Sequence, residues 1–238
     1  MSFSNKIQVL SNSFLQADVF DKLKEQAAEQ FKGIPTGFEA KLPWLAPVYN
    51  ISPRIEDYFF RATPIIISDL PNRNGVAFPL NQLTAWHKER FCQGYETWKY
   101  APMFEEHRSD DITKALGVVA DVSLRKIVGY ANDRLWMVLA LAAIDRTHSS
   151  PIVKDYESGK VNTVSMGAMV ETWTCSYCGA AEGMCHHIDA EYEGVTFYEL
   201  NGRLVYKCVQ SISGYELSIV RDPAYGVAIG SDKLLKYV

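Results

Sequence analysis

The sequence predicts an α+β domain with a β-rich, barrel-like core and helices inserted between the strands. Three observations support this fold class. Runs of β-branched and aromatic residues recur from residue 58 onward, and turn sequences separate them. Helical periodicity is confined to a few segments. The chain has 238 residues, of which 47% are hydrophobic, so it is long enough to bury a core of its own.

Residues 1–57 are expected to form an N-terminal arm ahead of a domain that occupies residues 58–238. Within the arm, Ser13–Phe31 is a predicted helix, because Ser13 and Gln16 have capping-box spacing and apolar residues then recur every four positions. Lys41–Pro53 combines several prolines with apolar side chains. This pattern predicts an extended segment that lies across another surface.

The domain of residues 58–238 is expected to alternate strands with two helices. The predicted helices are Leu80–Phe91, from its helical spacing, and Pro151–Lys160, which has a proline in its first turn. Tight turns are expected at Pro71–Gly75 and at Asn201-Gly202, and Pro64 indicates an edge or a break in the first strand. The predicted strands are Tyr58–Ser68, Ala115–Leu124, Arg134–Asp145, the segment around Ser165, Val195–Tyr198, Leu204–Val209 and Glu216–Val220.

Composition and charge argue against several classes of function. The net charge is −4, and no group of Lys and Arg accompanies the cysteines, so direct binding of nucleic acid is not expected. The longest apolar run, Leu135–Ile144, is shorter than the roughly 20 residues that a membrane helix needs, and it predicts a buried strand or helix. The first residues lack the apolar region of a secretory signal. An odd number of cysteines, five in all, argues against a disulfide framework and for a reducing, cytosolic environment.

Ser165 and His107 are the residues best suited to nucleophilic chemistry. Ser165 lies between two β-branched residues and Met166-Gly167, where a strand edge can present its hydroxyl. A serine nucleophile needs a base, and His107 lies where an apolar segment gives way to a polar loop, a common position for catalytic groups. A third, acidic group would orient the imidazole, and Glu216 and Asp145 are the candidates at strand ends.

The cysteines and histidines of residues 171–193 have the spacing of a metal site. Cys175, Cys178, Cys185 and His187 offer three sulfurs and one nitrogen, a closed tetrahedral set suited to structural Zn²⁺. His186 competes with His187 as the fourth ligand. The alternatives are three reduced thiols in a loop, or a zinc knuckle that binds nucleic acid, and the acidic balance argues against the second of these. The segment is therefore predicted to be a small zinc-knuckle insertion.

Six short segments carry a further signal because they occur together in one order: N-R-N-G-V-A-F-P (72–79), E-H-R-S-D-D-I-T-K-A-L-G-V-V-A-D (106–121), V-S-M-G (164–167), C-S-Y-C-G (175–179), C-H-H-I (185–188) and E-L-S-I-V-R-D-P-A (216–224). In these segments the chain resembles the prohead (capsid-maturation) proteases of large tailed bacteriophages, relatives in fold of the herpesvirus assemblins. Residues 1–57 match no part of that family.

The resemblance implies a serine endopeptidase. The serine of the family's S-x-G segment is the nucleophile, which corresponds to Ser165, and the histidine of its H-R or H-K segment is the base, which corresponds to His107. Glu216 is the preferred third member and Asp145 the alternative. The loop after Val220 is expected to help form the oxyanion hole, through Arg221.

The resemblance also implies partners and a location. The substrates would be scaffold proteins, the N-terminal segment of the major capsid protein and the protease itself. The protein would act in the host cytoplasm, inside the prohead or virion, as a homo-oligomer or in association with the capsid. The alternative is a non-catalytic structural protein of the virion or scaffold that retains the fold and a structural zinc site.

Overall fold

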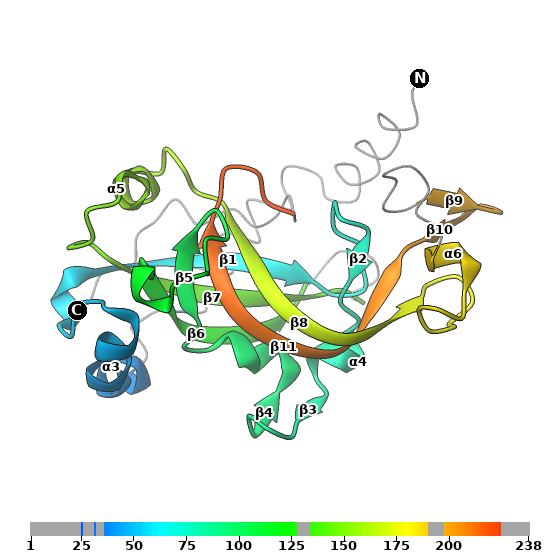
Figure 1. The fold of residues 1–238 in the computed structure, drawn as a ribbon, viewed down its shortest axis with the longest axis horizontal. Helices are drawn as coiled ribbons and strands as arrows, with labels where there is room; N and C mark the ends of the chain where they lie inside the picture. The colour runs from blue at the N-terminus through cyan, green and yellow to red at the C-terminus, as the bar shows by residue number, and fades with distance from the viewer. Residues whose placement is uncertain (1–24, 26–30, 32–35, 128–133, 190–197, 225–238) are drawn as a thin grey trace.

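The computed structural model describes residues 25, 31, 36–127, 134–189 and 198–224. In this part of the chain, a seven-stranded sheet curls into a half-barrel, and four α-helices accompany it (Figure 1). The predicted β-rich α+β class with a barrel-like core is therefore confirmed at this level. The predicted helix Ser13–Phe31 lies outside the described residues except for Glu25 and Phe31.

The sheet is mostly antiparallel. Its order is β1 (Tyr58–Ile67), β7 (Trp136–Asp145), β6 (Gly117–Lys126), β5 (Pro102–Glu105), β11 (Lys207–Ile219) and β2 (Val76–Ala77), and β8 (Val164–Cys175) also pairs with β11. Only the pairings of β11 with β5 and with β2 are parallel. Strand β1 ends the path, and its register shifts between Pro64 and Ile66, as the proline predicted.

The core is built around strands β1 and β7. Every residue of β1 and nine of the ten residues of β7 are buried, so the apolar run Leu135–Ile144 is a strand with both faces covered. No helix among the described residues has the length and apolarity to cross a membrane. Helix α5 (Pro151–Ser158) begins with the predicted proline and buries Tyr156, whose carbonyl accepts a hydrogen bond from the buried Arg61.

The segment predicted to be extended is mostly helical, and that prediction is wrong. Helix α3 (Thr36–Tyr49) contains Pro43 and Pro47. Both prolines are exposed, so the carbonyls that lose a backbone donor face solvent. The opposite face buries Phe38, Leu42 and Ala46 at helical spacing, in the same core as β1. Burial of this apolar face outweighs the low helix propensity of the two prolines. The predicted domain boundary at residue 57 stays a prediction.

The predicted helix Leu80–Phe91 is also wrong beyond its first turn. Helix α4 (Leu80–Leu83) ends where the Thr84 hydroxyl donates to the Leu80 carbonyl, and a hairpin of β3 (Trp86–His87) and β4 (Cys92–Gln93) follows. Gly94 then approaches the helix so closely that an added Cβ would lie 2.7 Å from the Gln82 carbonyl oxygen. Trp86, one of the residues whose spacing predicted the helix, is 61% exposed. The spacing therefore did not mark the buried face of a helix.

Strands β8 and β11 form a long, bent antiparallel ribbon that connects the two candidate sites (Figure 1). At one end Ser165 lies opposite Ser218, and at the other Cys175 lies opposite Lys207. The hairpin of β9 (Tyr198–Leu200) and β10 (Arg203–Val205) and helix α6 (His186–Asp189) flank the second end, and the hairpin turns at Asn201-Gly202 as predicted. Short 3₁₀ segments η1 (Ile55–Asp57), η2 (Gly94–Trp98) and η3 (Ile112–Lys114) complete the elements.

Candidate functional site

A cavity of about 290 Å³ at the first end of the ribbon contains both residues expected to be catalytic. Ser165 lines it from β8, and His107 lines it from the loop after β5. The cavity is also lined by Tyr215, Asn72 and Ala224. The fold therefore brings Ser165 and His107, which are far apart in the chain, into one pocket.

His107 is paired with Glu216. The distance from its Nδ1 to Oε1 of the carboxylate is 2.8 Å, and Glu216 is fully buried while the imidazole is about half exposed. A carboxylate can only accept, so Nδ1 carries the hydrogen and Nε2 remains as the basic nitrogen. The hydrogen bond to Glu216 raises the pKa of His107, although partial burial opposes this effect.

Ser218 holds the Glu216 carboxylate from the other side. Its hydroxyl donates to Oε2 of Glu216 at 2.6 Å and accepts the backbone N–H of His107 at 3.2 Å. Glu216 and Ser218 are two positions apart on β11, so their side chains share one face of the strand. Ser218 is itself fully buried, and it connects the base and the carboxylate in one network.

The backbone at His107 is left-handed. Glu106 has φ 47° and His107 has φ 58°, in a region that non-glycine residues seldom occupy. Such a conformation costs on the order of 1–3 kcal/mol and persists only where the surroundings impose it. Here the Glu106 N–H donates to the Ile219 carbonyl, and the His107 N–H donates to Ser218. Strand β11 therefore imposes the conformation that directs the imidazole to Glu216.

Gly167 leaves the space that Glu216 occupies. A Cβ at this position would lie 2.4 Å from Oε1 and 2.8 Å from Cγ of Glu216. The buried Trp98 fixes the backbone there, because its Nε1 donates to the Gly167 carbonyl at 3.1 Å. The glycine two residues after Ser165 is thus required for close approach of the carboxylate to β8.

Ser165 is half-buried and lies directly opposite Ser218 in the ladder, so it shares the face that carries Glu216. Within the described residues its hydroxyl makes no hydrogen bond to His107. Catalytic hydrogen bonds are often long without substrate and shorten when it binds. The arrangement places a hydroxyl, an imidazole whose Nε2 has no hydrogen-bond partner among the described residues, and a buried carboxylate around one cavity.

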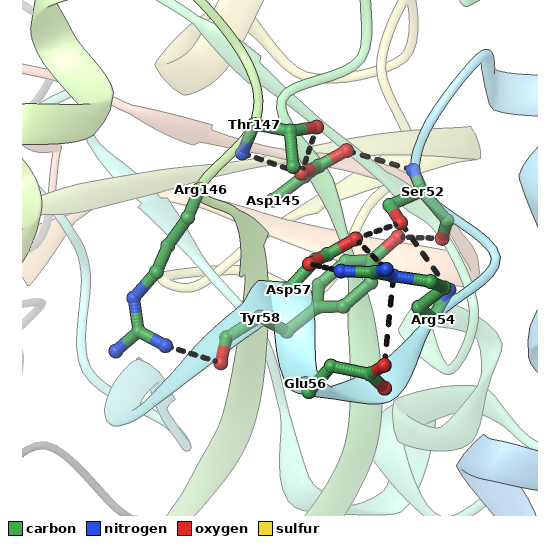
Figure 2. A network of polar contacts seen from close by, with 8 residues as sticks. All are labelled: Ser52, Arg54, Glu56, Asp57, Tyr58, Asp145, Arg146 and Thr147. Atoms are coloured by element: carbon green, nitrogen blue, oxygen red, sulfur yellow. Dashed lines mark hydrogen bonds and ion pairs between the residues drawn. The ribbon is translucent and has the colours of Figure 1, made fainter.

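Asp145, the alternative acidic residue, belongs to a different network (Figure 2). Its carboxylate accepts the backbone N–H of Ser52 at 2.7 Å, and the N–H and hydroxyl of Thr147 at 2.8 and 2.7 Å. Tyr58 donates to the Ser52 carbonyl in the same network. Asp145 therefore fixes the chain before β1 and the turn after β7, and the structure pairs His107 with Glu216 instead.

The loop after Val220 reaches the cavity only in part. Ala224 lines it, but the Arg221 backbone N–H donates to Oε1 of Glu106 at 3.1 Å. This backbone N–H is therefore engaged by Glu106, and a role of the loop in an oxyanion hole stays a prediction. The loop is held by Arg73, which pairs with Asp222 and donates its backbone N–H to the Ala224 carbonyl.

At the other end of the ribbon, Cys175, Cys178, Cys185 and His187 form a cluster that could hold a metal ion. One potential ligand atom from each lies within 4.8 Å of all the others. Sγ of Cys185 lies 3.3 Å from Sγ of Cys178 and 3.3 Å from Nδ1 of His187. Hydrogen bonds from the Ala180 backbone N–H, and from Cys185 and His187, lower the pKa of Cys178 to about 6. Burial raises the pKa of Cys185 to about 11, so this thiol would be deprotonated only with a cation bound.

Of the two adjacent histidines, His187 supplies the nitrogen of the cluster. The Tyr177 ring lies 4.9 Å from the His187 ring, and the Tyr198 hydroxyl donates to the His187 carbonyl. Cys175 and Cys185 also belong, with Ile188 and Val205, to a small apolar cluster that is separate from the main core. Because this cluster buries so few apolar side chains, a bound metal would add stability to this end of the ribbon.

Sequence reasoning missed Ser218, Trp98 and Asn72 as parts of the first site. Ser218 had a local signal, since it stands two positions after Glu216 in a strand. Asn72 stood in the predicted turn and in the segment 72–79, but neither signal indicated a part in the site. Trp98 had no local signal, because its contact with Gly167 joins distant segments. In comparisons with known proteins, no family model, no curated protein and no solved structure matches the chain.

Proposed function

We propose that the protein is a serine endopeptidase of the prohead type, with Ser165 as nucleophile, His107 as base and Glu216 as the orienting carboxylate. The observation that carries the proposal is the His107–Glu216 hydrogen bond of 2.8 Å at the cavity that Ser165 also lines. A structural role alone requires neither a free Nε2 on a half-exposed imidazole nor a left-handed backbone that directs it.

The chemistry is acyl transfer. Nε2 of His107 takes the Ser165 proton while Oγ bonds to the scissile carbonyl carbon, whose π electrons move to oxygen. The tetrahedral intermediate collapses as the C–N bond breaks and His107 returns the proton to the leaving amine. Water then attacks the acyl-enzyme by the same route. Glu216 keeps Nδ1 protonated and stabilises the imidazolium.

The proposed substrates are scaffold proteins, the major capsid protein and the chain itself, cleaved within an assembling shell. This part depends on the segments shared with the prohead proteases. The ion proposed for the Cys3His cluster is structural Zn²⁺, because three thiolates and one imidazole fill a tetrahedral site without an open position.

The test is covalent labelling of Ser165. Purified protein is treated with a fluorophosphonate, and the modified residue is mapped by mass spectrometry. Wild type and Ser213→Ala should be labelled at Ser165, whereas Ser165→Ala should not. Ser213 is a matched control because it is also a half-buried serine of the ribbon. Coexpression of each variant with a capsid precursor then reports trimming, and trimming by Ser165→Ala would show that another residue is the nucleophile.

One observation favours a second candidate, a non-catalytic virion or scaffold-associated protein. Within the described residues, Ser165 and His107 share a cavity without a hydrogen bond between them. Under this alternative, wild-type protein resists the fluorophosphonate at every pH, while Glu216→Gln still destabilises the fold. The labelling experiment therefore separates the two candidates.

A further inference from the structure

Asn72 is a buried residue of the candidate active site for which the mechanism above has no role. It is 7% exposed and lines the cavity together with Ser165 and His107. It belongs to the turn between β1 and β2, which the sequence identified as a tight turn and as part of the segment 72–79, but not as part of the site.

The orientation of the Asn72 carboxamide is fixed by its own turn. Oδ1 accepts the backbone N–H of Asn74 at 3.0 Å and that of Val76 at 3.1 Å. An amide whose oxygen accepts two backbone hydrogens cannot be flipped without losing both. Nδ2 is therefore the polar atom left over, and within the described part of the chain it has no hydrogen-bond partner.

Asn72 thus presents to the cavity an amide donor whose orientation the turn already fixes and which no group of the described residues binds. A negative charge that develops in the cavity during catalysis is a ligand for such a donor. Acyl transfer generates such a charge on the carbonyl oxygen that Ser165 attacks. Preorganised N–H donors at this point cost no reorganisation during the reaction. In the loop after Val220, the backbone N–H of Arg221 donates to Glu106 and is not available for this task.

We propose that Asn72 is a catalytic residue whose Nδ2 donates to the oxyanion of the tetrahedral intermediate. The inference rests on the proposed peptidase activity and adds the group that stabilises its transition state. As Oγ of Ser165 bonds to the carbonyl carbon and its proton passes to Nε2 of His107, the carbonyl oxygen gains a negative charge. The carboxamide of Asn72 binds that charge, and the donor is released when the C–N bond breaks.

The decisive variant is Asn72→Asp. An aspartate retains an oxygen that accepts the N–H groups of Asn74 and Val76, so the turn is preserved, but it replaces the donor with an acceptor. Asn81→Asp is the matched control, since it adds the same charge at an exposed asparagine that does not line the cavity. The readout is the rate of phosphonylation of Ser165 by a fluorophosphonate at a pH above the pKa of His107. In that reaction Oγ bonds to phosphorus, fluoride leaves, and the phosphoryl oxygen takes the place of the oxyanion.

Asn72→Asp should react about 10²–10³-fold more slowly than wild type, the usual effect of losing one oxyanion donor, and Asn81→Asp should stay close to the wild-type rate. Equal rates for the two variants would overturn the role of Asn72 while leaving the peptidase proposal intact. Wild-type protein that does not react at Ser165 would overturn both.

A second measurement does not depend on the folding of a variant. In ¹⁵N-labelled wild-type protein, phosphonylation of Ser165 should move the side-chain NH₂ resonances of Asn72 downfield and leave those of Asn81 nearly unchanged. Asn72 resonances that do not respond to the adduct would contradict the proposal.

Discussion

A methyl group at position 167 should separate Glu216 from His107. In Gly167→Ala the new Cβ would lie 2.4 Å from Oε1 of Glu216, whereas ordinary contact begins at 3.4 Å. The carboxylate must therefore withdraw by about 1 Å, which lengthens its 2.8 Å hydrogen bond to His107 beyond hydrogen-bond range. A displacement of about 1 Å at a catalytic group can lower the rate about 10²-fold.

The assay for Gly167→Ala combines two measurements. NMR titration should show the pKa of His107 lower than in wild type, because the hydrogen bond to Glu216 is the largest cause of its elevation. The rate of fluorophosphonate labelling at Ser165 should fall. Gly37→Ala is the control, since its Cβ meets only the Tyr100 hydroxyl, at 3.7 Å. An unchanged His107 pKa and labelling rate in Gly167→Ala would refute the argument that this glycine makes room for the carboxylate.

The remaining predictions concern the base, its support and the metal. Glu216→Gln should lower the pKa of His107, so fluorophosphonate labelling of Ser165 should begin at lower pH but reach a lower maximum rate. In wild type, the ion pair of protonated His107 with Glu216 stabilises the fold at acid pH. This stabilisation is lost as the pH rises through the elevated pKa of His107. Ser218→Ala should lower the free energy of unfolding by about 1.5–3 kcal/mol, because it removes a hydrogen bond to a buried carboxylate, and Ser213→Ala should change it little in the same urea titration. Cys178→Ser should abolish stoichiometric zinc in elemental analysis, whereas Cys92→Ser should retain it; zinc-free wild-type protein would contradict the metal assignment. A chelator should increase hydrogen exchange around Ile188 and Val205 before it affects β1 and β7.

The sequence predicted well those elements whose signal is local. The apolar run of β7, the proline that begins α5 and the Asn201-Gly202 turn each follow from neighbouring residues. The Cys3His cluster was also predictable, because its ligands lie within a short segment. Predictions failed for α3 and for the segment after α4, where burial against distant strands, or a close return of the chain, outweighed local propensity.

For the candidate active site, the sequence by itself determined which residue types were available: a serine beside glycine, a histidine at the start of a polar loop and two strand-end acids. Only the tertiary structure decided that Glu216, 109 positions from His107, binds its Nδ1, while Asp145 joins another network. The same holds for Gly167, Ser218 and Asn72, whose roles require β8, β11 and the turn before β2 to meet. The physical reason is that propensity and periodicity act between near neighbours, whereas contacts between distant segments are fixed by strand register and burial, which the whole chain determines.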